Sequence, residues 1–237
     1  MNPSHVVLGG LKCGFSVEVM NSKTIRVRRL SSGMGKEAAD WHAVYELCCR
    51  TGNGGTPIAR DRWEFFGRLW VEPYKNIFPQ WTYVAEAESA IIGYLTGCPD
   101  TLAFAKVKFW SFSLPLLVDI IRGRYRRNQD ARRFVRRIFG LEKGPERVFP
   151  RGLSRKIRQD YPAHLHMNVE AGWRGSGVGT ELVEKFFSDL RSAGIPAVHL
   201  YCGADPLEFY RHLGFTELAK ITFCGAVIHV VGCRFRD

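Results

Sequence analysis

The chain has 237 residues, 46% of them hydrophobic, and its 34 Lys and Arg outnumber its 23 Asp and Glu to give a net charge of +11. This length fits one large domain or two small ones, and the apolar content is enough for a real core. The seven cysteines are odd in number and show no Cys-x-x-Cys spacing, which argues against zinc binding and thioredoxin-like redox chemistry. We therefore expect reduced thiols, no bound metal and a cytoplasmic location.

Residues 1–22 are expected to form a loosely structured lead-in. The apolar stretch Val6-Val7-Leu8 is followed by two glycines, which makes it too short for the hydrophobic region of a signal peptide. No apolar run reaches the length of a transmembrane helix. The sequence therefore predicts neither a signal peptide nor a membrane span.

The first regular elements are a strand at 24–28 and a helix at 36–50. The helix carries an apolar stripe, and Gly52 stands just beyond its end, where a C-terminal glycine is common. The stripe consists of Trp41, Val44, Tyr45 and Cys48.

A Gly-rich segment, 52–57, then interrupts the chain. Asp61 is placed to cap a second helix that carries Trp63, Phe66 and Trp70. Residues 81–87 and 90–97 alternate as two strands of a hairpin that turns at Glu88-Ser89.

The segment 101–160 holds the whole charge imbalance of the chain. It contains 16 Lys and Arg against five Asp and Glu, a net charge of +11. Within it, 109–121 is a mostly apolar run broken by Pro115, and 122–137 is expected to be helical. Three interpretations remain open: a cap with a solvated basic face, a site for nucleic acid or another polyanion through 122–158, and a membrane-surface segment.

The following segment contains the most informative motif. Residues 163–169 alternate as a strand, with His164, His166 and Asn168 on one face. The loop Arg174-Gly175-Ser176-Gly177-Val178-Gly179 follows, and 180–193 has helical periodicity. Glycines allow close approach of the backbone, and a helix N-terminus offers free N–H groups, so this loop predicts a site for phosphate oxygens.

After this helix, residues 197–201 predict another strand. Asp205 and Pro206 are expected to cap a short helix at 207–213, which Gly214 closes.

Two familiar phosphate loops do not fit the motif. A Walker loop requires Lys-Ser/Thr after its last glycine, where Thr180-Glu181 stands, and the glycine spacing differs from that of a dinucleotide fingerprint. The spacing resembles Arg-x-x-Gly-x-Gly, the pyrophosphate loop of the GNAT superfamily of acyl-CoA-dependent N-acetyltransferases. Phe209-Tyr210-Arg211-His212-Leu213-Gly214-Phe215 likewise resembles the Phe-Tyr-x-x-x-Gly-Phe hallmark of that superfamily.

The resemblance implies an α/β (α+β) GNAT fold over 23–237 as a single domain. Its central sheet would be mixed, mostly antiparallel, of about seven strands and flanked by helices. The basic segment 101–160 would be a long helical insertion between strands 3 and 4, where a minimal GNAT domain has only a short link. The resemblance also implies that the segment 52–57 helps to cover the acceptor, and a plain connection is the alternative.

A narrower resemblance covers about residues 24–235. It is to the acetyltransferase-like C-terminal domain of O-GlcNAc hydrolase and its stand-alone bacterial relatives. It rests on the insertion and on three motifs: Cys49-Arg50-Thr51-Gly52, residues 93–101, and Tyr161-Pro162-Ala163-His164-Leu165-His166. The eukaryotic domain resembles a pseudo-enzyme, whereas this chain keeps Arg174, Gly177 and Gly179 and so matches the relatives that bind acetyl-CoA.

The superfamily resemblance implies acetyl-CoA as cofactor. Main-chain amides would hold its pyrophosphate, and the strand would pair with its pantetheine arm. Arg174 would lie near the phosphates or form a surface salt bridge. The implied amide donors are Gly175, Ser176, Gly177, Val178, Gly179 and Thr180, and the implied strand residues are Met167, Asn168 and Val169.

Tyr210 matches the tyrosine that protonates the leaving thiolate in many relatives, or it only packs beside the cofactor. His164 and His166 are candidate bases for the acceptor amine or structural histidines, and Asp100 is a candidate to steer an ammonium group. Asn168 stands where close relatives prefer an aspartate, and a water relay is the alternative to a side-chain base. Where the family often has Asn, Asp205 is a substitute or only a helix cap.

The function predicted is transfer of an acetyl group to an amine, in a small molecule or at a protein lysine or N-terminus. The amine would attack directly in a ternary complex. Two alternatives remain open: a non-catalytic acyl-CoA-binding module, and a polyanion-binding module that uses the basic insertion.

Overall fold

Seven strands form one mixed sheet in the computed structural model, which describes residues 24–30, 35–52, 54–141, 150–223 and 226–235. The order across the sheet is β1-β2-β3-β4-β5-β7-β6, and the β4–β5 pair is parallel while the other neighbours are antiparallel. The strands are β1 (Arg26–Arg29), β2 (Thr82–Ala87), β3 (Ala90–Cys98), β4 (Ala163–Val169), β5 (Ala197–Cys202), β6 (Thr216–Phe223) and β7 (Ala226–Arg234). The expected mixed, mostly antiparallel sheet of about seven strands is confirmed, and the lead-in 1–22 lies outside the described residues.

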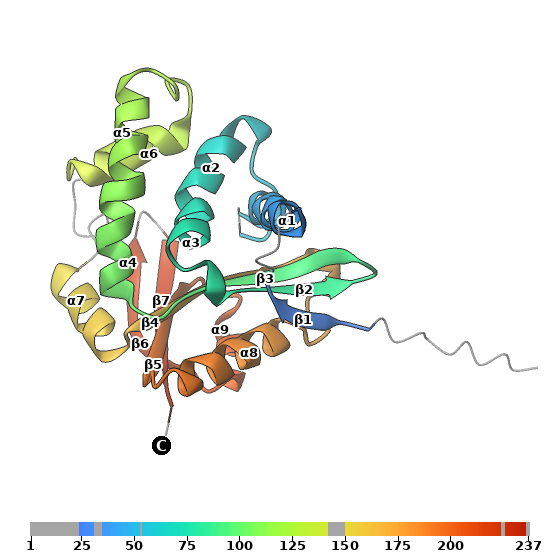
Figure 1. Ribbon diagram of the computed structural model, residues 1–237. Helices are drawn as coiled ribbons and strands as arrows, with labels where there is room; N and C mark the ends of the chain where they lie inside the picture. Colours follow the sequence, from blue (N-terminus) through green and yellow to red (C-terminus); the bar gives the residue numbers. More distant parts are fainter. Residues whose placement is uncertain (1–23, 31–34, 53, 142–149, 224–225, 236–237) are drawn as a thin grey trace, which may run out of the picture.

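Helices cover both faces of this sheet (Figure 1). The helices are α1 (Lys36–Thr51), α2 (Trp63–Trp70), α3 (Glu72–Ile77), α4 (Thr101–Lys108), α5 (Leu114–Ile121), α6 (Gln129–Ile138), α7 (Arg151–Asp160), α8 (Val178–Ser192) and α9 (Leu207–His212). Helices α1 to α3 lie on one side of the sheet, and α8 and α9 lie on the other. None of the described helices is long and apolar enough to cross a membrane.

The core follows the alternation of the strands. On one face, α8 buries Leu182, Val183 and Phe186 against the sheet, and on the other α1 buries Val44 and Leu47. Burial of such aliphatic and aromatic side chains contributes about 1.5–3 kcal/mol each to folding. These two apolar layers hold β4 between them.

The hairpin between β2 and β3 turns at the predicted dipeptide. Glu88 and Ser89 have φ angles of 51° and 66°, the left-handed pair that matches the twist of a two-residue hairpin loop. Helix α3 was not predicted from the sequence.

The insertion between β3 and β4 is helical, as expected. Helices α4 and α5 form one long rod beside α2 and α3, with α6 near its far end (Figure 1). Pro115 does not end this rod, contrary to the expectation of a break. The chain widens into a π-helical turn at Phe109–Ser113, with Leu114 N–H bonded to the Phe109 carbonyl, and so accommodates a residue that lacks an amide hydrogen.

Helix α6 begins later than predicted, at Gln129 instead of residue 122. Gly123 adopts a φ of 92°, which ends α5, and Asn128 Oδ1 accepts bonds from the amides of Asp130 and Ala131 at 2.9 and 3.1 Å. The apolar side of this region packs on α2, where the Phe65 ring lies 5.1 Å from that of Tyr125. These contacts agree with the interpretation of the insertion as a cap.

Two predicted helix caps are wrong. Asp61 lies in a 3-10 turn at Arg60–Arg62, and Asp205 lies in a turn before α9; neither side chain caps a helix. In both places a backbone carbonyl accepts the hydrogen bond of a nearby amide instead. Arg62 N–H donates to the Ala59 carbonyl, and Leu207 N–H donates to the Ala204 carbonyl.

Candidate active site

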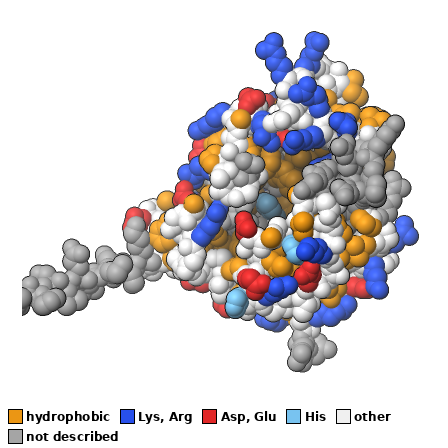
Figure 2. Space-filling model, turned by 180° about the vertical axis from the view of Figure 1, so that it is seen from behind, with side chains coloured by type: hydrophobic (Ala, Val, Ile, Leu, Met, Phe, Trp, Pro, Cys, Tyr) orange, Lys and Arg blue, Asp and Glu red, His pale blue; other side chains and the backbone are white. Residues whose placement is uncertain are grey.

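Strands β4 and β5 separate soon after they begin. Their parallel pairing joins only Ala163 to Val198 and His164 to His199, while the other edge of β4 pairs with β3 as far as Val169. A cleft of about 1580 Å³ opens along this separation. Figure 2 shows a hollow in the back face of the molecule, with hydrophobic and histidine side chains inside it.

The Gly loop and the start of α8 lie at one end of the cleft. Gly175 and Gly177 have φ angles of 79° and 89°, which side-chain-bearing residues rarely adopt, and Gly177 is the N-cap of α8. Within the described residues, none of the backbone amides from 175 to 180 donates a hydrogen bond to the protein. These free donors and the positive end of the helix dipole form a site suited to phosphate.

Close packing behind the loop also requires glycine. A Cβ on Gly179 would lie 3.0 Å from Cζ of Phe209 and 3.4 Å from Cε of Met167, so α8 approaches α9 and β4 closely here. Of the ten residues predicted to bind the cofactor, six line the cleft: Met167, Asn168, Val169, Arg174, Gly175 and Gly179. The other four, Ser176, Gly177, Val178 and Thr180, are not among its lining residues.

Arg174 forms no salt bridge in the described part of the chain. Its guanidinium donates to two carbonyls, those of Val169 at 3.3 Å and Gly55 at 3.4 Å. It thus joins the segment 52–57 to the end of β4, beside the Arg50–Glu170 ion pair of 3.3 Å. Because these two bonds are long, an anion in the loop would compete for the guanidinium readily.

Tyr210 lies on α9 and lines the cleft with only 6% of its surface exposed. Its ring packs on Phe209 and Phe215 at centroid distances of 5.1 and 5.5 Å. No described residue forms a hydrogen bond with its hydroxyl. Burial raises the pKa of this phenol well above 10, so the hydroxyl keeps its proton at neutral pH.

His164 has both ring nitrogens engaged. The Thr101 hydroxyl donates to the Pro162 carbonyl at 2.6 Å, so it accepts from Nδ1 of His164 at 2.8 Å. The Tyr74 hydroxyl then donates to Nε2 at 2.9 Å. Burial first, and neighbouring cations next, lower the pKa of this imidazole well below 6.5, which favours a structural role.

His166 faces the cleft between two aromatic rings. Its imidazole stacks on Trp70 at 5.9 Å and lies 6.1 Å from Tyr94. The Asn168 amide donates to the Tyr94 hydroxyl at 2.7 Å and to Nε2 of His166 at 3.2 Å, which leaves the proton of this histidine on Nδ1. Burial lowers its pKa to about 4, so His166 is neutral at pH 7 and a weak base.

Asp100 lies outside the cleft lining and caps α4. Its Oδ1 accepts from the amides of Leu102 and Ala103 at 2.9 and 3.0 Å. Sequence reasoning missed the aromatic wall of the cleft and the cation beside it. Lys108 Nζ lies 5.5 Å from the Trp70 ring and 5.8 Å from the Phe104 ring. The i, i+4 spacing of Phe104 and Lys108 on a helix was the available signal.

No group of three or more His, Cys, Asp or Glu side chains is placed to hold a metal ion within the described ranges. The cleft thus offers amide donors, a protonated phenol, neutral histidines and cations. Such groups bind and orient an anionic cofactor and supply a proton without a metal.

Comparisons with known proteins agree with this geometry. The sequence profile of a family described as "Acetyltransferase (GNAT) domain" matches residues 135–217, a range that includes β4, the Gly loop and α9. The solved structure described as "Crystal structure of SsHAT" is 24% identical, with a TM-score of 0.63, and the alignment covers 90% of this chain and 100% of that one.

A second structure, PH1933 from Pyrococcus horikoshii OT3, is 11% identical with a TM-score of 0.54, over 90% of this chain and 100% of that one. A GCN5-related N-acetyltransferase from Kribbella flavida is 15% identical with a TM-score of 0.49, over 89% and 98%. The narrower resemblance to the O-GlcNAc hydrolase domain stays a prediction. The profile match identifies a GNAT acetyltransferase domain within residues 135–217, and the solved structures share the fold of most of the chain.

Proposed function

We propose that this chain transfers the acetyl group of acetyl-CoA to an amine by direct attack in a ternary complex. One observation carries the proposal: the Gly loop, whose amides are free, reaches the cleft between β4 and β5 at Gly175 and Gly179, and Tyr210 lines the same cleft. An anion-binding loop positions a phosphate-bearing donor, and a protonated phenol is positioned for its leaving group.

In this proposal the Gly loop binds the pyrophosphate, and the unpaired edge of β4 from Met167 to Val169 binds the amides of the pantetheine arm. The edge is available because β5 leaves β4 after His164. Arg174 exchanges its two carbonyl contacts for the phosphates. In this proposal the cofactor is bound by backbone amides and carbonyls. The predicted residues can therefore bind it without all of their side chains lining the cleft.

Tyr210 has the role of proton donor. The acceptor nitrogen bonds to the acetyl carbon, the carbon–sulfur bond breaks, and the Tyr210 hydroxyl protonates the departing thiolate. The phenol then regains a proton from solvent. Its raised pKa keeps it protonated before each turnover.

The proton on the acceptor amine leaves to water in this proposal. His164 has no free nitrogen, and His166 presents an N–H to the cleft and has a pKa of about 4. Lys108 contributes differently: a nearby cation and a desolvated site both favour the neutral form of an amine. The acceptor therefore becomes nucleophilic without a dedicated base.

The test is calorimetric titration with acetyl-CoA, together with release of CoA over a panel of amines. Ser176→Glu places a carboxylate in the loop, where the native hydroxyl only donates to the Trp173 carbonyl. We expect it to weaken acetyl-CoA binding at least tenfold, because the new charge repels the phosphates. Ser188→Glu, exposed on α8 away from the cleft, is the matched control and keeps the affinity.

The outcomes separate the alternatives. No heat with acetyl-CoA refutes the proposal. Binding with no CoA release over any amine indicates a non-catalytic acyl-CoA-binding module.

A second candidate function, polyanion binding, rests on the exposed arginines around α6. Few of them have an acidic partner in the described residues; Arg133 lies 4.0 Å from Asp130, and Arg124 pairs with Glu64. Such a surface would bind phosphate chains with a steep dependence on salt. It would be independent of the acetyltransferase cleft.

A further inference from the structure

The acceptor side of the cleft carries cations and almost no acids. Lys108 on α4 and Arg155 and Arg158 on α7 line it, and Asp205 is the one carboxylate among its lining residues. Arg158 also forms a hydrogen bond with Tyr201, which lies beyond the point where β5 leaves β4. None of the three cations forms a salt bridge within the described residues.

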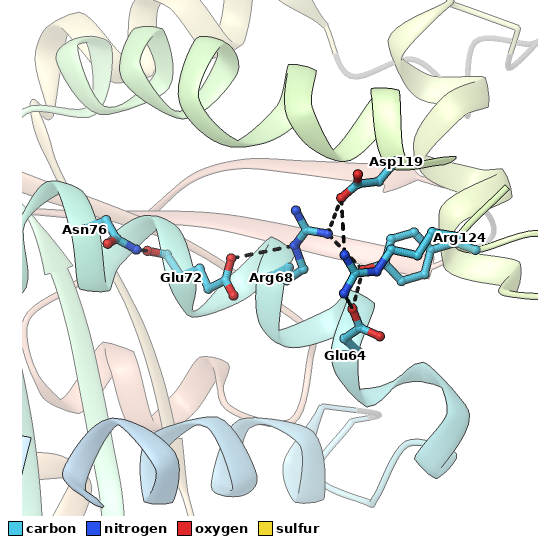
Figure 3. A network of polar contacts seen from close by, with 7 residues as sticks. Glu64, Arg68, Glu72, Asn76, Asp119 and Arg124 are labelled. Atoms are coloured by element: carbon cyan, nitrogen blue, oxygen red, sulfur yellow. Dashed lines mark hydrogen bonds and ion pairs between the residues drawn. The ribbon is translucent and has the colours of Figure 1, made fainter. Parts of the chain in front are cut away.

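Two of the three acids that the structure describes in the insertion, Asp119 and Asp130, form ion pairs away from the cleft. Asp119 forms an ion pair with Arg68 at 2.6 Å, and Arg124 forms one with Glu64 of α2 at 2.6 Å (Figure 3). Asp130 pairs with another arginine, Arg62, at 2.7 Å. These ion pairs attach the insertion to α2 and the preceding turn. Among the described residues, the insertion therefore lines the cleft with cations and with no carboxylate.

The positions of two cations are informative. Lys108 and Arg158 come from different helices, yet both act electrostatically on His164, which lies at the base of the split between β4 and β5. Both therefore lie near the split, and both line the cleft. Lys108 is half-buried against the rings of Trp70 and Phe104, a setting in which an ammonium group has lost part of its hydration.

A desolvated cation with no carboxylate partner is unfavourable unless a ligand supplies the negative charge. We propose that the acceptor is an amine that also carries an anionic group, a carboxylate or a phosphate, which Lys108 and Arg158 bind. The inference rests on the proposed acetyl transfer. A polycationic acceptor, such as a lysine-rich tail, would be repelled by the same groups.

The geometry also explains how one ligand can present both ends. The anionic group lies with the cations of α4 and α7, and the aromatic side chains of Trp70 and Phe104 contact the apolar part of the acceptor. The amine then points into the split, towards the Tyr210 side of the cleft. The insertion thereby selects the acceptor, while the Gly loop selects the donor.

The experiment compares matched acceptors that differ only in the anionic group. Phenylalanine against phenylalaninamide tests a carboxylate, and glucosamine 6-phosphate against glucosamine tests a phosphate. CoA release with acetyl-CoA gives kcat/KM for each. We expect the anionic member of at least one pair to be preferred tenfold or more, and the pair that responds identifies the group. A neutral member used equally well or better in both pairs overturns the inference.

Lys108→Met and Arg158→Gln test the residues independently, so that one variant failing to fold does not decide the matter. Each is expected to lower kcat/KM about tenfold more for the preferred anionic acceptor than for its neutral partner and to leave the acetyl-CoA Kd unchanged. Arg132→Gln, exposed on α6 and outside the cleft lining, is the matched control. An unchanged preference in both folded variants contradicts the inference.

A second measurement needs no turnover. The N-acetylated products of the pair that responds, either N-acetylphenylalanine and its amide or N-acetylglucosamine 6-phosphate and N-acetylglucosamine, are titrated into the complex with CoA. Tighter binding of the acid supports the anionic site, and equal or weaker binding refutes it. Absence of acetyl-CoA binding in the same calorimeter would instead refute the proposed function, so the two failures are distinguishable.

Discussion

Replacing Tyr210 by phenylalanine removes one hydroxyl and keeps the ring. The ring contacts with Phe209 and Phe215, at 5.1 and 5.5 Å, do not depend on the oxygen. The hydroxyl lines the cleft and has no protein partner among the described residues, so no hydrogen bond is lost. We expect the free energy of unfolding to change by less than about 0.5 kcal/mol.

The kinetic effect is expected to be large. General acid catalysis by one positioned side chain contributes about 10²–10⁴-fold, so Tyr210→Phe should lower kcat by a factor of this order. The Kd for acetyl-CoA should stay within about twofold, because the phosphate-binding amides belong to another element. Steady-state CoA release and calorimetry on the same sample measure both quantities.

Tyr83→Phe is the matched control, for which we expect a loss of stability and no change in kcat. Its hydroxyl donates to Asp189 at 2.8 Å, and neither residue lines the cleft. Loss of that bond should cost about 1–2 kcal/mol, a fall in Tm of about 2–8 °C, with kcat unchanged. If Tyr210→Phe retained kcat, or if it lost stability like the control, the assignment of Tyr210 as proton donor would be refuted.

Three further predictions follow from burial, backbone angle and charge. His164, His166 and His199 have pKa values lowered by burial from an ordinary 6.5, the last two to about 4. Between pH 6.5 and 4 the unfolded state therefore binds more protons than the folded state. The free energy of unfolding should fall as the pH drops through this range, by at most about 1.4 kcal/mol per pH unit for each histidine. Chemical denaturation measures this free energy, and a value that stays constant over the range contradicts the prediction. Gly177→Ala forces a left-handed φ of 89° on alanine and should lower the free energy of unfolding, measured by thermal unfolding, by about 1–2 kcal/mol. Gly152→Ala is the control: it lies in α7 with open space around it and should leave the stability unchanged or raise it. Four exposed arginines test the polyanion candidate when they are replaced by glutamate: Arg126, Arg127, Arg132 and Arg133. The variant should release CoA at an unchanged rate and lose the salt-sensitive retention on nucleic acid. Unaltered retention would rule out polyanion binding through these residues.

The part of the fold that the sequence predicted well is locally determined. The strand at 163–169, the glycines that follow and the helix at 180–193 each carry their own periodicity or backbone requirement, so their order was readable. The hairpin at Glu88-Ser89 is similar, because two residues decide the turn. Boundaries in the insertion were less readable, since the π-helical turn before Pro115 depends on packing along the whole rod.

The candidate catalytic residues were less predictable because their protonation and hydrogen bonds depend on partners distant in the sequence. His164 forms hydrogen bonds with Tyr74, 90 residues away in the sequence, and with Thr101, 63 residues away. These two bonds occupy both nitrogens of its ring. The same applies to Lys108, whose importance arises only when α4 lies beside Trp70. A sequence shows which groups are present, and tertiary packing decides which of them face the cleft.

The early separation of β5 from β4 has a consequence for the ligand-free protein. On the side of β5, the main-chain groups of β4 beyond His164 pair with none of the described strands, and such unpaired strand edges are templates for foreign strands. A bound pantetheine arm would act as the missing neighbour. Amide hydrogen exchange from Leu165 to Val169 should therefore slow on addition of CoA, and the loaded protein should resist self-association better than the empty one.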